Sequence, residues 1–342
     1  RLSRLSRTPR AAASSAPASG GWLRRGAIAL LILSGALTFG YAGASTYAAS
    51  LLVYRAQLPL SGDPSQSGLT YTDITFPARG DGLQIKGWVI PGVLPSGRLT
   101  DDRILIVVHG TWRNRTDSAA GVLDLSVAFA RHGFAVLALD LRGMGESPPA
   151  PLSMGYYEQR DVLGAVDFIQ HGDWPYPELG RPRMIGGWGV SLGAATLLFA
   201  AAQEPAIRAV VSDCAYADII PIFEREIPAQ GGVPSLLTPG ILAAAWAVYG
   251  VNFWAVRPVD VIARIAPRPI LLIHGSADDY IPPANMGELY AAASAAPNAQ
   301  VGEWLVPGAK HAQSYHVAGA AYVARVVGFF TAALGADQSG AA

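Results

Sequence analysis

One glycine-rich segment constrains the fold of this chain more than any other. It reads Gly187-Trp188-Gly189-Val190-Ser191-Leu192-Gly193, and it lies between a short apolar stretch and a run of small apolar residues. The pattern predicts a strand, a sharp turn and a helix, and its glycines provide the space that such a turn needs. A turn of this kind raises the side chain of Ser191 above the edge of a sheet. We therefore expect a fold built of strand–helix units, with Ser191 presented for chemistry.

Apolar runs typical of strands alternate with helical patterns over residues 71–334. The alternation predicts an α/β fold, in which a mostly parallel eight-stranded sheet carries helices on both faces. The first two strands should form an antiparallel edge, because only a tight turn joins them. The predicted strands are 71–76, 83–90, 104–108, 135–139, 184–188, 207–212, 269–273 and 301–306, and the predicted helices are 118–132, 156–170, 192–202, 283–293 and 318–334.

Residues 218–258 interrupt this alternation. The segment is too long for a loop in a compact domain and shows no strand pattern, yet it is rich in aromatic and aliphatic residues. We interpret it as a helical insertion that covers one end of the sheet as a lid, although extra core packing would account for part of it. The expected α/β domain with this lid spans 71–335, followed by a flexible tail at 336–342.

The N-terminal part of the chain has a different character. Residues 1–25 carry arginines and no acidic residue, and we predict a disordered basic tail there. Residues 26–54 contain no charged side chain and suit a transmembrane helix, with a linker at 55–70. Arginines before this helix favour a cytoplasmic N-terminus, and thus an extracytoplasmic catalytic domain in a single-pass protein. A cleaved signal peptide, with an apolar core from 27 to 39 and small residues at Ala42 and Ala44, would give a secreted protein and is the alternative; a buried core helix is a third.

Composition excludes several classes of protein. Apolar residues make up 51% of the 342 residues and charged residues 15%, so the chain can bury a sizeable core. Its formal net charge is zero, which argues against a nucleic-acid partner. The single cysteine, Cys214, rules out an intrachain disulfide and cannot form a zinc site alone. We expect no metal and no cofactor.

A serine nucleophile requires a base and an acid that orients the base. Where a serine occupies such a turn, the acid and then the histidine follow it in the chain. His311 comes after the last predicted strand and is the expected base. His274 ends a strand before the expected acid, and His316 begins the last helix as a surface residue. The histidine that precedes the serine, His109, is expected to support its loop structurally.

Asp278 follows a strand end and is the acid that we favour, with Asp213, after the preceding strand, as the second choice. The adjacent Asp279 should point elsewhere. The oxyanion formed on an attacked carbonyl needs backbone N–H donors. We expect them from Leu192, directly after the serine, and from Thr111 in the loop after the third strand, with Trp112 close behind.

The segments that carry these residues resemble the α/β-hydrolase superfamily, and within it the prolyl-oligopeptidase-like and serine-aminopeptidase-like branch of bacterial hydrolases. The segment 140–147 reads Asp-Leu-Arg-Gly-Met-Gly-Glu-Ser, and Met144 stands where this family usually has histidine. The other matching pieces are His109-Gly110, Asn114-Arg115, the Ser191 turn, His274-Gly275 with Asp278, Ile281-Pro282, and His311. They span most of residues 71–334.

The residues and the resemblance together imply acyl transfer to water through a Ser191–His311–Asp278 triad and an acyl-enzyme. We favour an ester over a peptide substrate, because no propeller domain or clear site for a peptide amino group is evident. An apolar lid near a membrane favours an acyl ester or lipid-like small molecule. The alternatives are a serine peptidase or aminopeptidase with Glu224 and Glu226 holding an amino group, an acyltransferase, and a membrane-tethered binding protein without activity. The sequence does not predict the oligomeric state.

Overall fold

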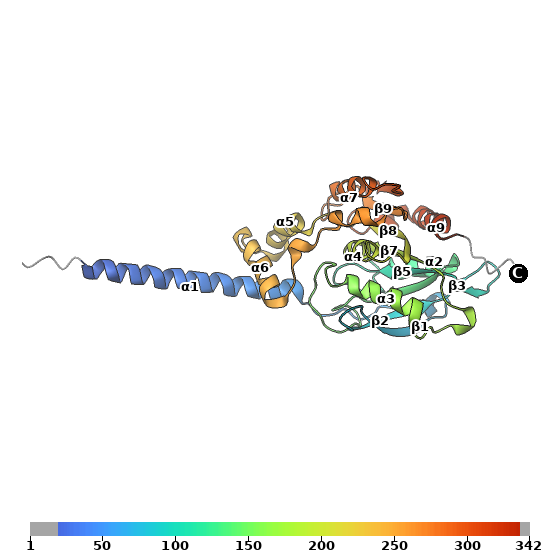
Figure 1. Cartoon of the computed structure of the whole chain (residues 1–342), viewed down its shortest axis with the longest axis horizontal. Coiled ribbons are helices and arrows are strands. Elements are labelled where there is room, and N and C mark those ends of the chain that lie inside the picture. Colours follow the sequence, from blue (N-terminus) through green and yellow to red (C-terminus); the bar gives the residue numbers. More distant parts are fainter. Residues whose placement is uncertain (1–19, 336–342) are drawn as a thin grey trace, which may run out of the picture. The chain divides into compact units, whose positions relative to one another are not determined.

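The computed structural model of the protein describes residues 20–335. The predicted flexible tail at 336–342 and most of the predicted basic tail lie outside the described residues. The chain divides after Ala44 into two compact units. Helix α1, Gly20–Val53, begins in the first unit and ends in the second (Figure 1). It starts earlier than the predicted helix at 26, so that Arg24 and Arg25 lie in its second turn.

Over Gly21–Val53, α1 is long and apolar enough to be a membrane span or a signal sequence. Its side chains are almost all exposed from 21 to 44. In the second unit, the last turns of α1 behave differently, because Ser45, Ala49 and Val53 are buried against the core. Leaving these turns aside, residues 26–44 form a helix about 28 Å long, close to the thickness of a bilayer core.

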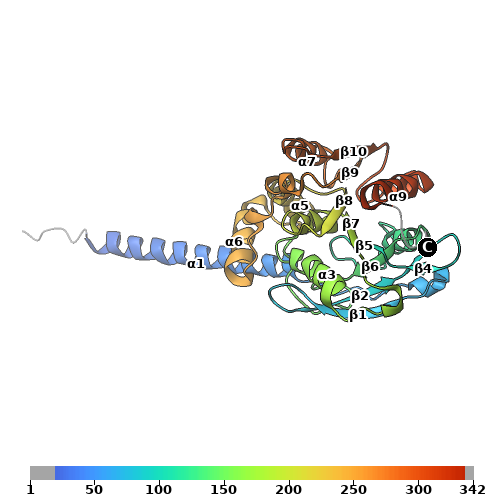
Figure 2. The same ribbon diagram turned by 45° about the vertical axis from the view of Figure 1, so that its right-hand side comes forward.

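The second unit contains an eight-stranded sheet in the order β1-β2-β6-β5-β7-β8-β9-β10 (Figure 2). The pairs β1–β2 and β2–β6 are antiparallel and all the others are parallel, which confirms the predicted mostly parallel sheet and its antiparallel edge. The strands are β1 Thr72–Pro77, β2 Gln84–Ile90, β5 Arg103–Val108, β6 Ala135–Leu139, β7 Met184–Val190, β8 Ile207–Asp213, β9 Ile270–Gly275 and β10 Val301–Val306.

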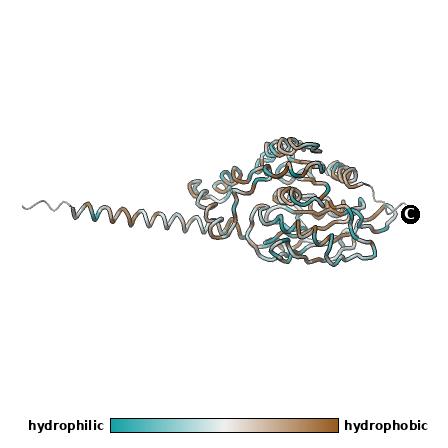
Figure 3. The backbone as a smooth tube through the Cα atoms, in the orientation of Figure 1, coloured by the Kyte–Doolittle hydropathy of each residue, from teal (hydrophilic) through white to brown (hydrophobic). Residues whose placement is uncertain are grey.

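Helices cover both faces of this sheet. The helices are α2 Val122–Arg131, α3 Gln159–His171, α4 Leu192–Ala201, α5 Ile219–Gly231, α6 Thr238–Tyr249, α7 Ala284–Ser294, α8 Ser314–Ala318 and α9 Ala320–Leu334. Helices α3, α4 and α7 bury apolar side chains on one face, and α2 and α9 on the other. Strand β5 shows why two layers form: Ile104, Ile106 and Val108 face the first core, and Leu105 and Val107 face the second. Figure 3 shows these central strands as hydrophobic.

Several element boundaries differ from the predictions for local physical reasons. Helix α2 begins at Val122 instead of 118, because Gly121 has a left-handed φ of 69°. The predicted helix 318–334 begins at Ala320 as α9, because Gly319, φ 52°, separates it from the short helix α8, which was not predicted. A two-stranded hairpin, β3 Gly92–Val93 with β4 Leu99–Thr100, was not predicted. Short 3₁₀ turns occupy Pro64–Ser67, Pro177–Leu179, Ser235–Leu237, Phe253–Ala255, Pro258–Asp260 and Ile262–Ile265.

The predicted insertion at 218–258 lies between the neighbouring strands β8 and β9 and contains helices α5 and α6. Asp218 begins α5 by accepting a hydrogen bond from the Ile220 N–H, and Gly250 ends α6 in a left-handed conformation. The inner side of α6 is buried through Ile241, Leu242 and Ala245. The insertion therefore packs on the core as a helical layer beyond the sheet edge at which the site residues lie.

Candidate active site

Ser191 occupies a strained turn between strand β7 and helix α4. Its backbone has φ 55° and ψ −119°, which residues other than glycine rarely adopt. A Cβ atom on Gly189 would lie 2.5 Å from the Gly193 carbonyl oxygen, and one on Gly193 would lie 2.2 Å from the Val108 carbonyl oxygen. Glycine is therefore needed on both sides of the serine. Strain concentrated in one residue is typical of functional sites.

His311 lies in the loop after β10 and faces Ser191. Its Nε2 atom is 3.0 Å from Ser191 Oγ, and its Nδ1 atom is 2.8 Å from Asp278 Oδ2. The imidazole is about one-fifth exposed, while the Asp278 carboxylate is fully buried. The ring of Tyr280 contacts the imidazole edge-on, with 4.9 Å between centroids. The predicted serine, histidine and acid are thus brought together in one hydrogen-bonded row.

Asp278 is held in its ionised form by its surroundings. The backbone N–H groups of Tyr280 and Ile281 donate to Asp278 Oδ1 at 3.0 and 2.8 Å. Burial alone would raise the pKa of Asp278, but hydrogen bonds from His274 and His311 and the charge of His311 outweigh it and lower the pKa to about 2. An ionised Asp278 keeps the proton on His311 Nδ1, which leaves Nε2 as the acceptor that faces the serine hydroxyl.

The second-choice acid, Asp213, is bonded elsewhere. Its two carboxylate oxygens accept from Ser314 Oγ at 3.0 Å and from the Tyr322 hydroxyl at 2.8 Å. Burial raises the pKa of Asp213, although both of these hydrogen bonds act in the opposite direction. Asp213 therefore anchors the segment that follows His311, and Asp278 is the acid in direct contact with the imidazole.

The remaining histidines have other partners. His274 Nε2 is 2.8 Å from the Ile281 carbonyl oxygen and 3.4 Å from Asp278 Oδ2, so it supports the acid and the loop that carries it. His109 is fully buried, with Nδ1 against the Gly110 carbonyl oxygen and Nε2 accepting from the Leu141 N–H. Burial lowers the pKa of His109. His316 is bonded to the Ser118 carbonyl oxygen at the surface. Each of the three thus has a structural environment.

The two expected oxyanion donors lie beside the serine. Leu192 is the first residue of α4, and an N–H in the first turn of a helix has no intrahelical acceptor. Thr111 follows β5 in a loop where Trp112 adopts a positive φ of 56°. A Cβ atom on Gly110 would lie only 3.6 Å from Ser191 Cβ, so this loop packs directly against the turn. Within residues 20–335, no acceptor is found for the N–H of Thr111 or Leu192.

Cys214 lies behind the triad. Its sulfur and ligand atoms of Asp278 and His311 lie within 4.8 Å of one another, a spacing that a metal ion could use. However, a metal binds the thiolate, and burial raises the pKa of the Cys214 thiol well above its ordinary value. Asp278 and His311 are also already bonded to each other. The surroundings of Cys214 therefore do not favour a metal centre.

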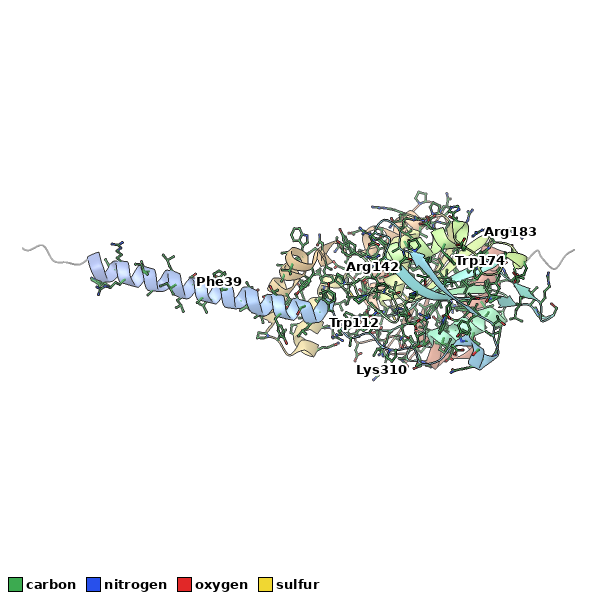
Figure 4. All side chains as sticks on the ribbon, turned by 90° about the horizontal axis from the view of Figure 1, so that it is seen from below. Phe39, Trp112, Arg142, Trp174, Arg183 and Lys310 are labelled. Carbon is green, nitrogen blue, oxygen red and sulfur yellow. The ribbon has the colours of Figure 1, made fainter. Side chains whose placement is uncertain are left out.

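A cavity of about 610 Å³ opens over Ser191 and His311. Its floor is formed by Ser191, His311 and the loop of Thr111 and Trp112. Its walls come from two places that are far apart in the sequence. One is the end of α1, with Leu51 and Leu52, together with Arg55 just after it. The other is the insertion, with Phe223, Ile227, Val233 and Ile241. In Figure 4, Trp112 lies beside the C-terminal end of α1, and the Arg55 guanidinium lies over the Trp112 ring. Sequence reasoning did not predict that α1 lines the site.

The segment 140–147 supports the site from beneath and does not enter the cavity. Asp140 accepts from the Arg115 backbone N–H at 2.8 Å and pairs with its guanidinium, which also pairs with Glu146. Arg142 donates to the buried Asp161 at 2.7 Å. A Cβ atom on Gly145 would lie 2.2 Å from the Asp140 carboxylate. These contacts fix the loop in place, and Met144 is buried in the core.

This fold and the position of its site define a class of protein. The family model for the alpha/beta hydrolase fold matches residues 103–230. The protein has the α/β-hydrolase fold, with a mostly parallel eight-stranded sheet. This confirms the fold that the resemblance in the sequence motifs implied.

Relatives and solved structures agree with this assignment. The uncharacterized protein YfhR of Escherichia coli (strain K12) is 27% identical over 264 residues, which are 76% of this chain and 81% of YfhR. The uncharacterized protein YqkD of Bacillus subtilis (strain 168) is 29% identical over 215 residues, 61% of this chain and 64% of YqkD.

Among solved structures, the esterase Pf2001 of Pyrococcus furiosus superposes with a TM-score of 0.67 at 21% identity, over 83% of this chain and 99% of that one. The acylaminoacyl peptidase of Pyrococcus horikoshii gives a TM-score of 0.58 at 16% identity, over 80% of this chain and 44% of that one. At these identities the superpositions establish the fold. Together with the family match, they support a hydrolase.

Proposed function

We propose that the protein is a serine hydrolase that cleaves a carboxylic ester through Ser191, His311 and Asp278. The observation that carries the proposal is the row of two hydrogen bonds, 2.8 Å from Asp278 to His311 and 3.0 Å from His311 to Ser191. A serine hydroxyl is a weak nucleophile until an adjacent base accepts its proton. An intact row of this kind at the floor of a cavity argues against a binding protein without activity.

In the proposed reaction, Ser191 Oγ bonds to the ester carbonyl carbon while His311 Nε2 takes the hydroxyl proton. The carbonyl oxygen becomes an oxyanion that accepts from the N–H groups of Thr111 and Leu192. The oxyanion then collapses, the C–O bond to the alcohol breaks, and His311 returns its proton to the departing alkoxide. Water attacks the resulting acyl-enzyme by the same route, which releases the carboxylic acid and restores Ser191.

The cavity favours an ester with an apolar acyl group over an aminoacyl substrate. A peptide amino group would need an unpaired carboxylate near the site. Glu226 is the carboxylate from the insertion that lines the cavity, but it pairs with Arg225 at 2.5 Å and accepts from Gln230 at 2.8 Å. Most of the wall from the insertion is aliphatic or aromatic. The esterase and the acylaminoacyl peptidase of similar fold correspond to these two possibilities.

A substrate panel tests the ester assignment. We expect purified protein to hydrolyse p-nitrophenyl esters of two to twelve acyl carbons, and to leave aminoacyl p-nitroanilides intact. Activity on the anilides alone would overturn the ester assignment and favour a peptidase. Addition of glycerol or methanol distinguishes the acyltransferase alternative, because a transferase would divert the acyl group to the alcohol instead of releasing the acid.

We also propose that residues 26–44 anchor the protein in a membrane, with the hydrolase domain outside the cytoplasm. Support comes from the length and apolar character of this helix and from Arg24 and Arg25 at its N-terminal side. Carbonate washing of membranes and mass spectrometry of the intact chain provide the test. Retention in the pellet with the N-terminal helix present supports an anchor, whereas a soluble product starting near Ser45 would establish a cleaved signal sequence.

A further inference from the structure

The insertion carries an exposed apolar surface that the catalytic row does not use. Residues 232–256 contain no charged side chain. Four of their large apolar side chains are exposed to solvent, namely Leu236 (76%), Trp246 (58%), Val248 (57%) and Trp254 (41%). We call these four side chains the lid surface. The two indole rings contact each other edge-on, with 6.3 Å between centroids.

The charged residues that flank this uncharged segment in the sequence are paired. Arg257 follows the uncharged segment and pairs with Asp218 and Asp260. Arg225 and Glu226, which precede it in α5, pair with each other. An exposed apolar surface of this kind marks an interaction site on a soluble domain. Exposed tryptophans are enriched at the membrane–water interface, where one side of the ring meets hydrocarbon and the other meets water.

The lid surface lies beside the chain that leaves the proposed anchor. The Tyr249 ring at the end of α6 contacts the Tyr54 ring edge-on at 5.8 Å. Figures 1 and 2 both show α6 next to the C-terminal end of α1. Tyr54 is only ten residues after Ala44, so α6 contacts the segment that follows the proposed anchor in the chain.

We propose that the lid surface docks on the lipid bilayer in which the N-terminal helix is anchored, and that the substrate is an acyl ester taken from that bilayer. The proposal rests on the proposed anchor and ester hydrolase. The cavity wall is built from the same two elements, since Leu51 and Leu52 come from the end of α1 and Ile241 from α6. A long acyl chain would therefore pass from lipid to Ser191 between apolar walls, without crossing bulk water.

Depth-dependent fluorescence quenching tests the docking without relying on activity. The full chain with Val248→Cys is labelled with an NBD fluorophore and placed, one copy each, in nanodiscs of phosphatidylcholine with brominated acyl chains. The native Cys214 is buried with a raised thiol pKa, so the introduced cysteine is the one that reacts. Thr331→Cys on α9 is the matched control, because it is exposed and α9 packs on the opposite face of the sheet from α6.

We expect brominated lipid to quench the label at residue 248 at least twofold more than the label at 331. Equal weak quenching at both positions would overturn the docking. If the fluorescence of the label at 248 changes only when several copies share a vesicle, the lid surface is an interface between copies and the proposal is wrong.

A kinetic comparison tests the substrate class. The double variant Trp246→Gln, Trp254→Gln should hydrolyse soluble p-nitrophenyl butyrate at the wild-type rate, because neither tryptophan lines the cavity. Its kcat/KM for p-nitrophenyl palmitate in phosphatidylcholine vesicles should fall about tenfold. Leu305→Gln, an exposed apolar residue on edge strand β10, should change neither rate. An unchanged rate of the double variant on the vesicle ester would refute the proposal. Absence of both activities in the wild-type protein would instead refute the proposed hydrolase function itself.

Discussion

Replacing the buried acid Asp278 tests whether it orients His311 to accept the proton of Ser191. In Asp278→Asn, the amide oxygen can keep the two bonds from the Tyr280 and Ile281 N–H groups, so the turn should survive. The amide NH₂ then takes the place of Oδ2, 2.8 Å from His311 Nδ1. A donor in that place requires Nδ1 to be an acceptor, which moves the ring proton to Nε2. His311 would then present an N–H to Ser191 and could not accept its proton.

The expected loss follows from this change of tautomer. Where an orienting aspartate has been replaced by asparagine with its geometry intact, turnover falls about 10⁴-fold. We expect a 10³- to 10⁴-fold loss of kcat for p-nitrophenyl acetate here, or about 4 to 5.5 kcal/mol of transition-state stabilisation. KM should change little, because Asp278 lies beneath the cavity. Near-ultraviolet circular dichroism should match that of the wild type.

Asp213→Asn is the matched comparison. This buried carboxylate bonds to Ser314 and Tyr322, so its replacement should reduce kcat less than tenfold while lowering the free energy of unfolding. The reasoning would be refuted if Asp213→Asn caused the larger loss of kcat, or if Asp278→Asn retained more than a tenth of the activity.

Two further predictions concern folding. Gly193→Ala should prevent accumulation of folded protein, because the new Cβ would lie 2.2 Å from the Val108 carbonyl oxygen. The control Gly302→Ala, whose Cβ would lie 3.5 Å from its nearest atom, should fold normally in a thermal-shift assay. A folded, active Gly193→Ala would contradict the tight turn. Burial raises the pKa of Asp101 to about 6, so its ionisation reduces the stability of the folded state as the pH rises from about 4 to 6. Asp101→Asn keeps an oxygen for the Trp174 indole N–H and should remove this loss of stability. Its free energy of unfolding in urea should therefore exceed that of the wild type at pH 8 but not at pH 4. Parallel pH profiles of the two proteins would contradict this assignment.

The strands of the sheet could be predicted from the sequence because they depend on local patterns. Each buried strand is a short apolar run between turn signals, and Val301–Val306 was predicted to the residue. The hairpin β3–β4 was missed, since two residues per strand leave no pattern to detect. Helix starts were predicted too early at α2, where a glycine in a left-handed conformation, Gly121, delays the first turn.

The candidate site was partly accessible for a related reason. Chain order and strand ends were enough to choose Ser191, Asp278 and His311, because parallel strands bring their carboxyl ends to one edge of the sheet. The cavity walls depend on tertiary contacts that no local pattern encodes. The last turns of α1 looked like part of a membrane span, since packing on a core and insertion in lipid require the same apolar side chains. The bonds from Ser314 and Tyr322 to Asp213, which favour Asp278 as the acid, likewise depend on tertiary contacts.

The central claim is that Ser191 is an activated nucleophile, and labelling with a fluorophosphonate probe tests it most directly. The probe phosphonylates a serine whose proton a neighbouring base removes. We predict that the wild-type protein is labelled within minutes, that Ser191→Ala is not labelled, and that His311→Ala is labelled far more slowly. A folded wild-type protein that remains unlabelled in lipid nanodiscs, or equal labelling of Ser191→Ala, would contradict the account.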